Sequence, residues 1–355
     1  MKMKSGPTMQ IERNATPTSH SCAPSRLRPI ALFAACATLS AALLSLLGLA
    51  GSSYWLADLF SHFRPQYTVA LALTLVLHLW HRQLWLGAVA AGLLFVNLSL
   101  IAPVYAAPST PREAGADEIA VLQFNVLQHN ERRAEAIAYL EACGADLILL
   151  QEIDGGWADA LATGLSSYEA AFVEARSTNF GIGLYVRRQA GITVERARLV
   201  RIDDEGWRHP AIESELRHAG RRLALLGVHA HPPINAHVAR IHRLELERIA
   251  EWSRARTGAH LVLGDFNMTP WSWRYRQLMG SSPLHSARDG FGIVASWLPL
   301  AGLSGGLPLD HILHSAAFTT ASFERGPSLG SDHQPILARL RWNTAGPSDD
   351  ALAGR

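Results

Sequence analysis

Side chains that bind metal ions and move protons follow several short apolar runs in this sequence. In LVLGDFNMTPW, residues 261–271, an acid and an amide, Asp265 and Asn267, flank Phe266 directly after an aliphatic run and a glycine. Further polar residues that stand at the ends of apolar runs are Asn125, Glu152, His229, Asp310, Asp332 and His333. Each alone has an ordinary explanation as a turn residue or surface acid. Together they indicate a reaction centre, because ionised side chains are costly to bury unpaired.

The elements that must position these residues alternate short apolar runs with amphipathic stretches. We expect helices over 131–144 and 235–256, where apolar residues recur at near-helical spacing. We expect strands over 119–127, 145–153, 180–188, 192–200, 211–218, 221–230, 260–267, 309–315 and 336–342. Strands in hairpin-like runs, interrupted by a few helices, predict two sheets packed face to face with helices outside.

The ordered motifs resemble the signature of the endonuclease/exonuclease/phosphatase superfamily of DNase I-like proteins. The resemblance covers about residues 118–342 and is carried by Asn125, QE at 151–152, GVH at 227–229, GDFN at 264–267, LDH at 309–311 and SDH at 331–333. It implies an α/β (α+β) fold: a four-layered sandwich of two packed, mainly antiparallel sheets with outer helices. It also implies a hydrolase that cleaves phosphate esters.

The same resemblance implies a metal site. Glu152 would be the principal ligand of a Mg²⁺ ion, which prefers hard oxygen donors. Asn125 would lie beside the ion, and Asp332 would support the ion or its waters. Mn²⁺ or Ca²⁺ could take the place of Mg²⁺.

The resemblance further implies the catalytic residues. His333 would pair with Asp310, which fixes the imidazole tautomer and favours its protonated form. Either His333 or Asp265 would take the proton of the attacking water. Asn267 would donate to the phosphate, and His229 would do the same or protonate the leaving group.

One departure concerns His229. DNase I-like relatives pair the corresponding histidine with a carboxylate from an earlier strand, but the local stretch GIGLYVRR offers Tyr185 and no acid. Glu213 or Glu215 could supply one.

Three other features carry further predictions. Arg176, Asn179 and Arg208 are candidate phosphate contacts, although most arginines are simply solvated. Of Trp271 and Trp273, we expect at least one to pack under the active-site loop. A second metal site at His231 and His237 is disfavoured, since a Pro-Pro turn and a helix start explain that segment.

The first part of the chain is apolar enough for a membrane. From Ile30 to Ala106 the only formal charges are Asp58, Arg64 and Arg82. The division we expect is a basic cytoplasmic tail (1–29), a transmembrane segment (30–106), a linker (107–117), the catalytic domain (118–342) and a disordered tail (343–355).

Three spans are the expected number, over 30–49, 66–80 and 84–105, with the middle one short. Basic residues before the first span put the N-terminus in the cytoplasm, and three spans then place the catalytic domain on the far side of a bacterial inner membrane. Two spans would reverse that orientation.

Charge bears on the substrate. Residues 107–355 contain 25 arginines against 28 acids, so this part lacks the bulk positive charge typical of a non-specific DNA binder. The favoured activity is still nuclease-type, because that is common in the family. The alternatives are a lipid-directed phosphodiesterase or phosphatase, related to phosphoinositide or sphingomyelin hydrolysis, and a catalytically inactive membrane binding protein. The expected partners are a nucleic acid or phospholipid headgroup and the bilayer, with no obligate protein partner.

Overall fold

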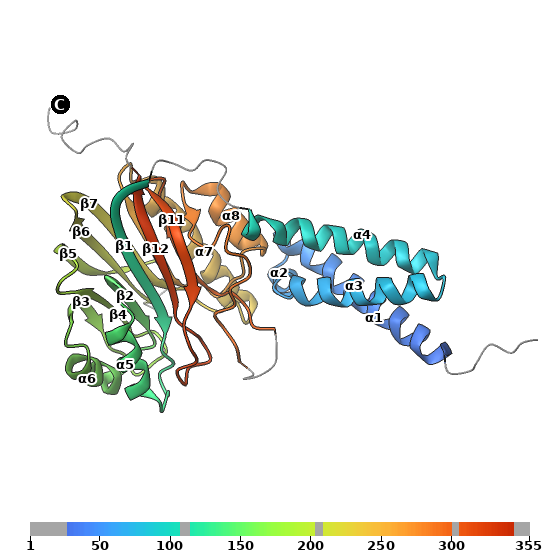
Figure 1. Cartoon of the computed structure of the whole chain (residues 1–355), viewed down its shortest axis with the longest axis horizontal. Helices are drawn as coiled ribbons and strands as arrows, with labels where there is room; N and C mark the ends of the chain where they lie inside the picture. Colours follow the sequence, from blue (N-terminus) through green and yellow to red (C-terminus); the bar gives the residue numbers. More distant parts are fainter. Residues whose placement is uncertain (1–26, 107–113, 203–208, 300–304, 344–355) are drawn as a thin grey trace, which may run out of the picture.

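The protein consists of a helical bundle joined to a sandwich of two sheets (Figure 1). The structure is a computed structural model and describes residues 27–106, 114–202, 209–299 and 305–343. The bundle contains α1 (Leu27–Leu49), α3 (Arg64–Trp80) and α4 (Leu84–Ile101). Short elements at the sandwich end of the bundle are η1 (Ala50–Ser52), α2 (Trp55–Ser61) and η2 (Ala102–Tyr105).

Each sheet has six described strands around a parallel central pair. The first has the order β11-β12-β1-β2-β4-β3 and the second β5-β6-β7-β8-β10-β9. The pairs β1–β2 and β7–β8 are parallel, and the other described pairs are antiparallel. The first sheet consists of β1 (Ala114–Asn125), β2 (Leu147–Gln151), β3 (Tyr168–Glu174), β4 (Ile182–Arg187), β11 (Phe318–Arg325) and β12 (Ile336–Asn343). The second consists of β5 (Ile192–Arg201), β6 (Pro210–His218), β7 (Arg221–His229), β8 (His260–Asp265), β9 (His285–Ser286) and β10 (Asp310–His314).

Three apolar cores hold the sandwich together in four layers. The core between the sheets includes Val121, Leu149, Leu225, Leu263 and Ile312. Helices α5 (Arg133–Ala142) and α6 (Gly155–Gly164) cover the outer face of the first sheet. Helices α7 (Ala236–Arg254) and α8 (Trp273–Ser281) cover the second. This confirms the predicted four-layered fold with mainly antiparallel sheets and outer helices.

Some predicted boundaries differ from the structure. Strand β1 begins at Ala114, so residues 114–117 of the expected linker belong to the first sheet. Strand β12 ends at Asn343, one residue into the expected tail. The remaining linker residues, 107–113, and the terminal segments 1–26 and 344–355 lie outside the described residues.

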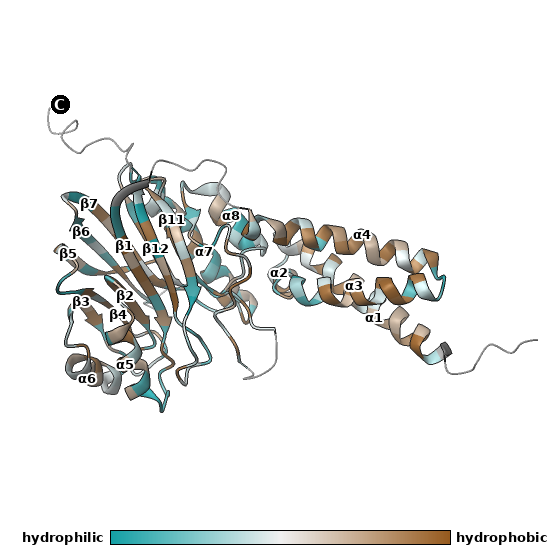
Figure 2. Ribbon diagram, in the orientation of Figure 1, coloured by the Kyte–Doolittle hydropathy of each residue, from teal (hydrophilic) through white to brown (hydrophobic). Residues whose placement is uncertain are grey.

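The three bundle helices lie side by side and consist largely of hydrophobic residues (Figure 2). Leu73, Trp85 and Phe95 are among the exposed large side chains. Residues 29–52 and 84–105 form helices long and apolar enough to cross a membrane. Helix α3, with 17 residues, falls short of that length, so by length and composition two of the three expected spans qualify.

A network of hydrogen bonds joins the bundle to the sandwich. The Asp58 carboxylate accepts from the backbone N–H groups of Trp273 (2.7 Å) and Arg274 (3.2 Å), at the start of α8. His62 Nδ1 accepts from Thr269 N at 3.2 Å. Nearby, Trp271 is buried against Ile101 and Val104 and donates through Nε1 to His62 O. The expected buried tryptophan is therefore Trp271, and it packs against the helical segment.

We predict that Asp58→Ala weakens this junction. The carboxylate serves helix α8 as a capping group does, so its loss should cost about 1 kcal/mol of stability. Thermal unfolding of the full chain in detergent, followed by tryptophan fluorescence, measures the change. Asp159→Ala, at an exposed position of α6, is the matched control. Equal melting temperatures for the two variants would contradict the capping role.

Candidate active site

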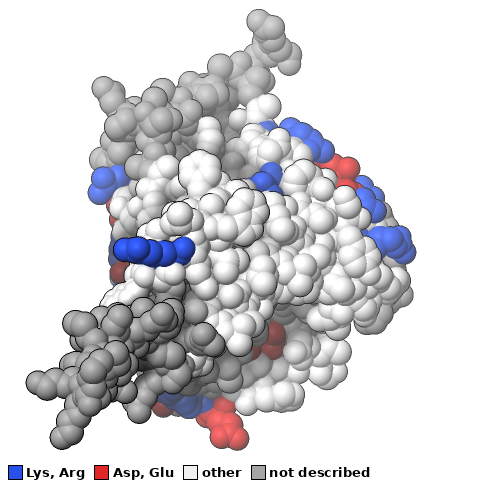
Figure 3. Space-filling view, turned by 90° about the vertical axis from the view of Figure 1, so that its right-hand side faces the viewer, with Lys and Arg blue, Asp and Glu red and all other residues white. Residues whose placement is uncertain are grey.

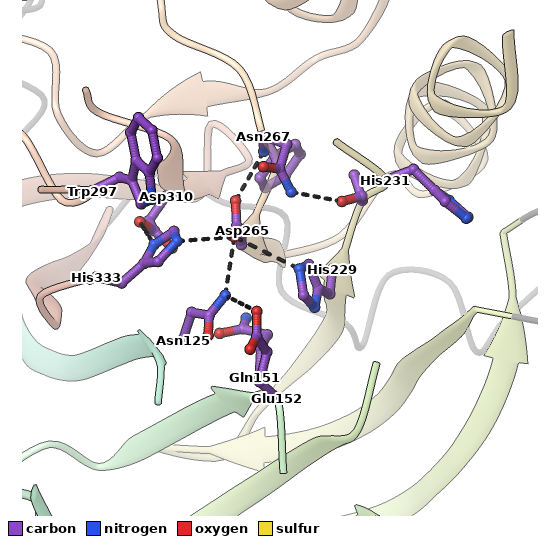
Figure 4. A network of polar contacts seen from close by, with 12 residues as sticks. Asn125, Gln151, Glu152, His229, His231, Asp265, Asn267, Trp297, Asp310 and His333 are labelled. Carbon is purple, nitrogen blue, oxygen red and sulfur yellow. Dashed lines mark hydrogen bonds and ion pairs between the residues drawn. The ribbon is translucent and has the colours of Figure 1, made fainter. Parts of the chain in front are cut away.

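The polar cluster lies in the layer between the sheets, at the carboxyl ends of both parallel strand pairs (Figure 4). Successive strand side chains point to opposite faces, so residues two apart share a face. Leu261 and Leu263 of β8 belong to the inner core, and Asp265 continues their row. In β7, Leu225 is likewise followed on the same face by Gly227 and His229. Because the polar residues continue these apolar rows, their side chains face the same place between the two sheets.

Asp310 and His333 form a buried ion pair. His333 Nδ1 donates to Asp310 Oδ2 at 2.8 Å, and His333 Nε2 lies 3.6 Å from Asp265 Oδ2. Burial alone would lower the pKa of His333, but Asp310 and Asp265 outweigh it and raise this pKa to about 10. Burial would raise the pKa of Asp310, yet His333 holds it below its ordinary value. The expected pairing is therefore present, with a protonated imidazole between two carboxylates.

Asp265 is the central group of the cluster. It accepts from Asn125 Nδ2 at 3.2 Å through Oδ2 and from the Asn267 backbone N–H at 2.9 Å through Oδ1. It also faces both histidines, since His229 Nε2 lies 3.7 Å from Asp265 Oδ2. Burial and then the charge of Asp310 raise the pKa of Asp265 to about 7. This carboxylate can therefore gain or lose a proton near neutral pH.

Glu152 reaches the site through an unusual backbone conformation. Its φ of +64° lies in the left-handed region, which a non-glycine residue rarely adopts. The turn carries its side chain to Asn125, whose Nδ2 donates to Glu152 Oε1 at 2.9 Å. Gln128 N donates to Oε2 at 3.3 Å. Such strain is typical of a functional position, and it supports the prediction made for Glu152.

The predicted metal residues fit a divalent cation. Burial raises the pKa of Glu152, and the negative charge of Asp332 raises it further. A cation held by these carboxylates would offset both the burial cost and their repulsion. Asn125 adjoins Glu152 through its Nδ2, while its Oδ1 accepts from the Leu127 backbone N–H at 3.1 Å. Asp332 is oriented by Trp297, whose Nε1 donates to Asp332 Oδ2 at 2.9 Å.

Among the described residues, no carboxylate from an earlier strand pairs with His229 as was expected. Tyr185 is buried on the outer face of the first sheet, in the core beneath α5 and α6. Glu213 bonds to Arg198, Trp252 and Arg256 on the opposite side of the second sheet, and Glu215 is exposed. The suggestion that Glu213 or Glu215 supplies the partner is therefore wrong. Burial, and next the charge of His333, lower the pKa of His229 to about 3, which makes it a neutral imidazole.

Two buried histidines hold the loop that carries Asn267. His242 Nε2 bonds to Phe266 O at 3.0 Å, and His311 Nε2 bonds to Met268 O at 2.8 Å. Asn267 has a φ of +50° and donates through Nδ2 to Ala230 O. Glycine is required just before this loop, because a Cβ at position 264 would lie 1.9 Å from Val228 O. His311 therefore supports the loop and does not enter the reaction centre.

Two buried glutamines position the site; Gln123 was not predicted, and Gln151 was named only as part of the QE motif. Gln123 Nε2 donates to Asp310 Oδ1 and to Gln151 Oε1, each at 2.8 Å. Gln151 Nε2 in turn donates to Val228 O on the other sheet. Both glutamines continue inner-face apolar rows, and a polar residue in such a row is the signal that could have found them.

A second cluster beside the site is a buried contact between histidine and glutamate side chains. His231 Nδ1 bonds to Glu245 Oε1 at 2.7 Å, and the His231 ring stacks on that of His209. These residues could together hold a metal by distance alone. However, the two rings are parallel within 5°, so their in-plane lone pairs do not converge on one ion. His237, the other histidine of the disfavoured second metal site, is exposed on α7 and is not part of this cluster.

The three candidate phosphate contacts differ in position. Arg176 bonds to Glu174, and Asn179 is exposed. Arg208 lies outside the described residues. Their phosphate contacts stay predictions.

Comparison with known proteins places this geometry in context. The sequence profile described as "Endonuclease/Exonuclease/phosphatase family" matches residues 122–333.

Among solved structures, D. rerio TDP2 complexed with single-strand DNA product shares 15% identity, with a TM-score of 0.55 over 63% of this chain and 99% of that chain. A Bacteroides vulgatus endonuclease/exonuclease/phosphatase shares 16%, with a TM-score of 0.53 over 64% and 99%. A Bacteroides thetaiotaomicron mannosyl-6-phosphatase shares 14%, with a TM-score of 0.51 over 62% and 99%. No curated protein sequence matches the chain. At these identities the structural likeness establishes the fold.

We predict that Asp310→Asn returns the pKa of His333 towards its ordinary value of 6.5 or below. The reason is that the Asp310 carboxylate then no longer offsets the lowering of this pKa by burial. NMR titration of the imidazole measures this pKa, with Asp159→Asn as control. The stabilisation of the folded state by protonated His333 should be complete below pH 6.5 and lost as pH rises towards 10, because folding raises the pKa of His333. It should also be lost in acid, because folding lowers the pKa of Asp310.

Removing one partner of a buried ion pair costs about 3–5 kcal/mol. Asp310→Asn should therefore lower the free energy of unfolding by this order at neutral pH. A His333 pKa that stays near 10 in the variant would contradict the pairing.

Proposed function

The chain belongs to the endonuclease/exonuclease/phosphatase family, and on that premise we propose that it is a membrane-anchored, metal-dependent phosphoesterase. It hydrolyses phosphodiester or phosphomonoester bonds by in-line attack of water. The observation that carries this proposal is one buried network. Asp310 pairs with His333, and His333 lies beside Asp265. Asn125 then bonds to both Asp265 and Glu152. A protein that kept only the fold would have no need of this desolvated polar set, which argues against an inactive binding protein.

Each residue has a definite task in this reaction. Asp310 orients His333 and keeps its imidazole protonated, and ionised Asp265 beside it takes the proton of the attacking water. Asn267 donates to a phosphate oxygen. Neutral His229 donates to the phosphate or to the leaving oxygen.

Family members use divalent metals, and we propose Mg²⁺ here, with Mn²⁺ or Ca²⁺ as substitutes. Glu152 would hold the ion, with Asn125 beside it and Asp332 supporting the ion or its waters. When bound, such an ion neutralises phosphate charge and assists the leaving oxygen.

Two substrate classes are proposed. A nuclease-type activity agrees with TDP2, whose structure contains a single-strand DNA product. A lipid-directed activity is favoured by the hollow beside Asn267, which is walled by Trp55 and Leu59 of α2 and by Pro233. Phosphate esters at a membrane surface would lie next to that helix. The net negative charge of residues 107–355 also weighs against non-specific binding of nucleic acid.

We further propose that the bundle crosses the membrane three times. Helices α1 and α4 both run towards the sandwich, so a chain that crosses in both must return between them (Figure 1). Helix α3 is the element that returns, and at ~1.5 Å per residue its 17 residues nearly span a hydrocarbon core. The catalytic domain then lies on the side opposite the basic tail, in the periplasm.

The activity prediction uses the full chain in detergent or vesicles. With Mg²⁺ it should cleave at least one of single- or double-stranded DNA, RNA, phosphoinositides and sphingomyelin. Glu152→Gln and His333→Ala should each lower kcat/KM by about 10²–10⁴-fold, the usual contribution of such groups. Asp159→Asn should retain activity. Turnover that survives chelation, or an active His333→Ala variant, would remove the basis of the proposed chemistry.

The topology prediction is independent of activity. Alkaline phosphatase fused to the C-terminus should be active, since that enzyme matures only outside the cytoplasm, and a green fluorescent protein fusion should be dark. The opposite pair of results would place the catalytic domain in the cytoplasm and reject three crossings.

A further inference from the structure

Exposed apolar side chains of the sandwich gather where the helical bundle joins it. Among the described residues beyond 113, the large hydrophobic side chains that are exposed are Val194, Ile234, Trp273 and Phe291. Val194 lies on β5, at the end of the sandwich far from the bundle (Figure 1). The other three, exposed by 72%, 37% and 39%, lie beside the bundle.

Three separate contacts place them there. The backbone N–H of Trp273 bonds to Asp58. Phe291 lies between Gly290 and Gly292, whose N–H groups both donate to Val104 O. Ile234 follows Pro233, which shares a hollow with Trp55 and Leu59 of α2. The three side chains therefore surround the junction at different points and do not form one contact.

The bundle contributes matching side chains at the same level. Tyr54, Leu56 and Phe63 flank or belong to α2, and Tyr105 ends η2; all four are exposed. Tyr105 lies near Gly292, where an added Cβ would meet its ring. We use the name collar for the seven residues Tyr54, Leu56, Phe63, Tyr105, Ile234, Trp273 and Phe291.

The side-chain types of the collar, and its continuity with the surface of the bundle, indicate what covers it. Scattered exposed apolar residues need no explanation, but a clustered set marks an interaction surface. This set is continuous with the apolar outer surface of the bundle and is rich in tyrosine and tryptophan, which favour the boundary between lipid and water. Arg276 lies over the Trp273 ring, where a cation can meet lipid phosphates. Seen along the bundle, uncharged side chains fill the centre of the view and most charged ones lie at its margin (Figure 3).

We propose that the collar rests on the surface of the lipid bilayer and holds the catalytic domain against it. The inference depends on the proposed anchoring by the bundle. The hydrogen bonds of Asp58 and His62 fix the domain to the bundle, so its orientation on the membrane is set by the fold. The Asn267 loop lies on the same side, because Asn267 shares the α2 hollow with Pro233.

The test uses the full chain, with its three native cysteines replaced, in vesicles of pure phospholipid. Single cysteines at Ile234→Cys and Phe291→Cys carry an environment-sensitive fluorophore, and the lipids carry a spin-label quencher near the headgroup. We expect blue-shifted, quenched emission at both positions. Val194→Cys is the matched control, because it is also exposed and apolar but lies on β5, and it should give unquenched emission. Thermal unfolding confirms that each labelled variant is folded.

A fourth label separates failure of this proposal from failure of the anchoring. Leu73→Cys lies on the exposed surface of α3 and should be quenched by a spin label deep in the acyl chains. If Leu73→Cys is quenched but Ile234→Cys and Phe291→Cys match Val194→Cys, the bilayer does not cover the collar and the proposal is wrong. If Leu73→Cys also stays unquenched, the anchoring fails, and the collar proposal fails with it.

Discussion

The active site depends on the alternation of side chains across the space between two sheets. One layer contains the apolar core at one end and the reacting groups at the other, because the same face of each central strand changes from aliphatic to polar residues. In β8 this change takes one step, from Leu263 to Asp265. A slip of one residue in any central strand would turn its polar group into an outer core. The register that packs the sandwich therefore also assembles the site.

Burial then determines the charges of these groups. A carboxylate removed from water must be paired, protonated or bound to a cation, and the first two responses are visible in this cluster. Asp310 stays ionised beside His333, Asp265 has its pKa raised to about 7, and Glu152 and Asp332 offer a site that a cation would stabilise. The backbone strain at Glu152 agrees with this interpretation, because a strained conformation persists only where the surrounding structure requires the side chain at that position.

The sequence predicted most of this arrangement, for physical reasons that also explain the omissions. The inner-face strands are strongly apolar and end at distinctive residues, so Asn125, His229 and Asp265 were placed correctly. Strands β3 and β11 lie at sheet edges and lack such runs, and both were missed. Glu213 was a wrong candidate because its contacts are set by residues distant in sequence, Arg198 and Trp252. Gln123 belongs to no motif, and Gln151 lies in the QE motif without an assigned task; only the tertiary contacts of Gln123 with Asp310 and Gln151 give the two glutamines a role.

The helical segment contributes to the support of the loop that carries Asn267. Asn267 lies two residues before Thr269, which is bonded to His62, and six before Trp273, whose N–H is bonded to Asp58. From inside the sandwich, His242 and His311 hold the carbonyl groups of Phe266 and Met268. The loop is thus fixed between the sheet core and α2, and a catalytic amide must be held within a fraction of an ångström to be effective. Separating the sandwich from the bundle would remove one of these two supports while leaving every catalytic side chain in the sequence. It follows that the helical bundle and the candidate site form one structural unit, and that activity measured on the full chain would report on both.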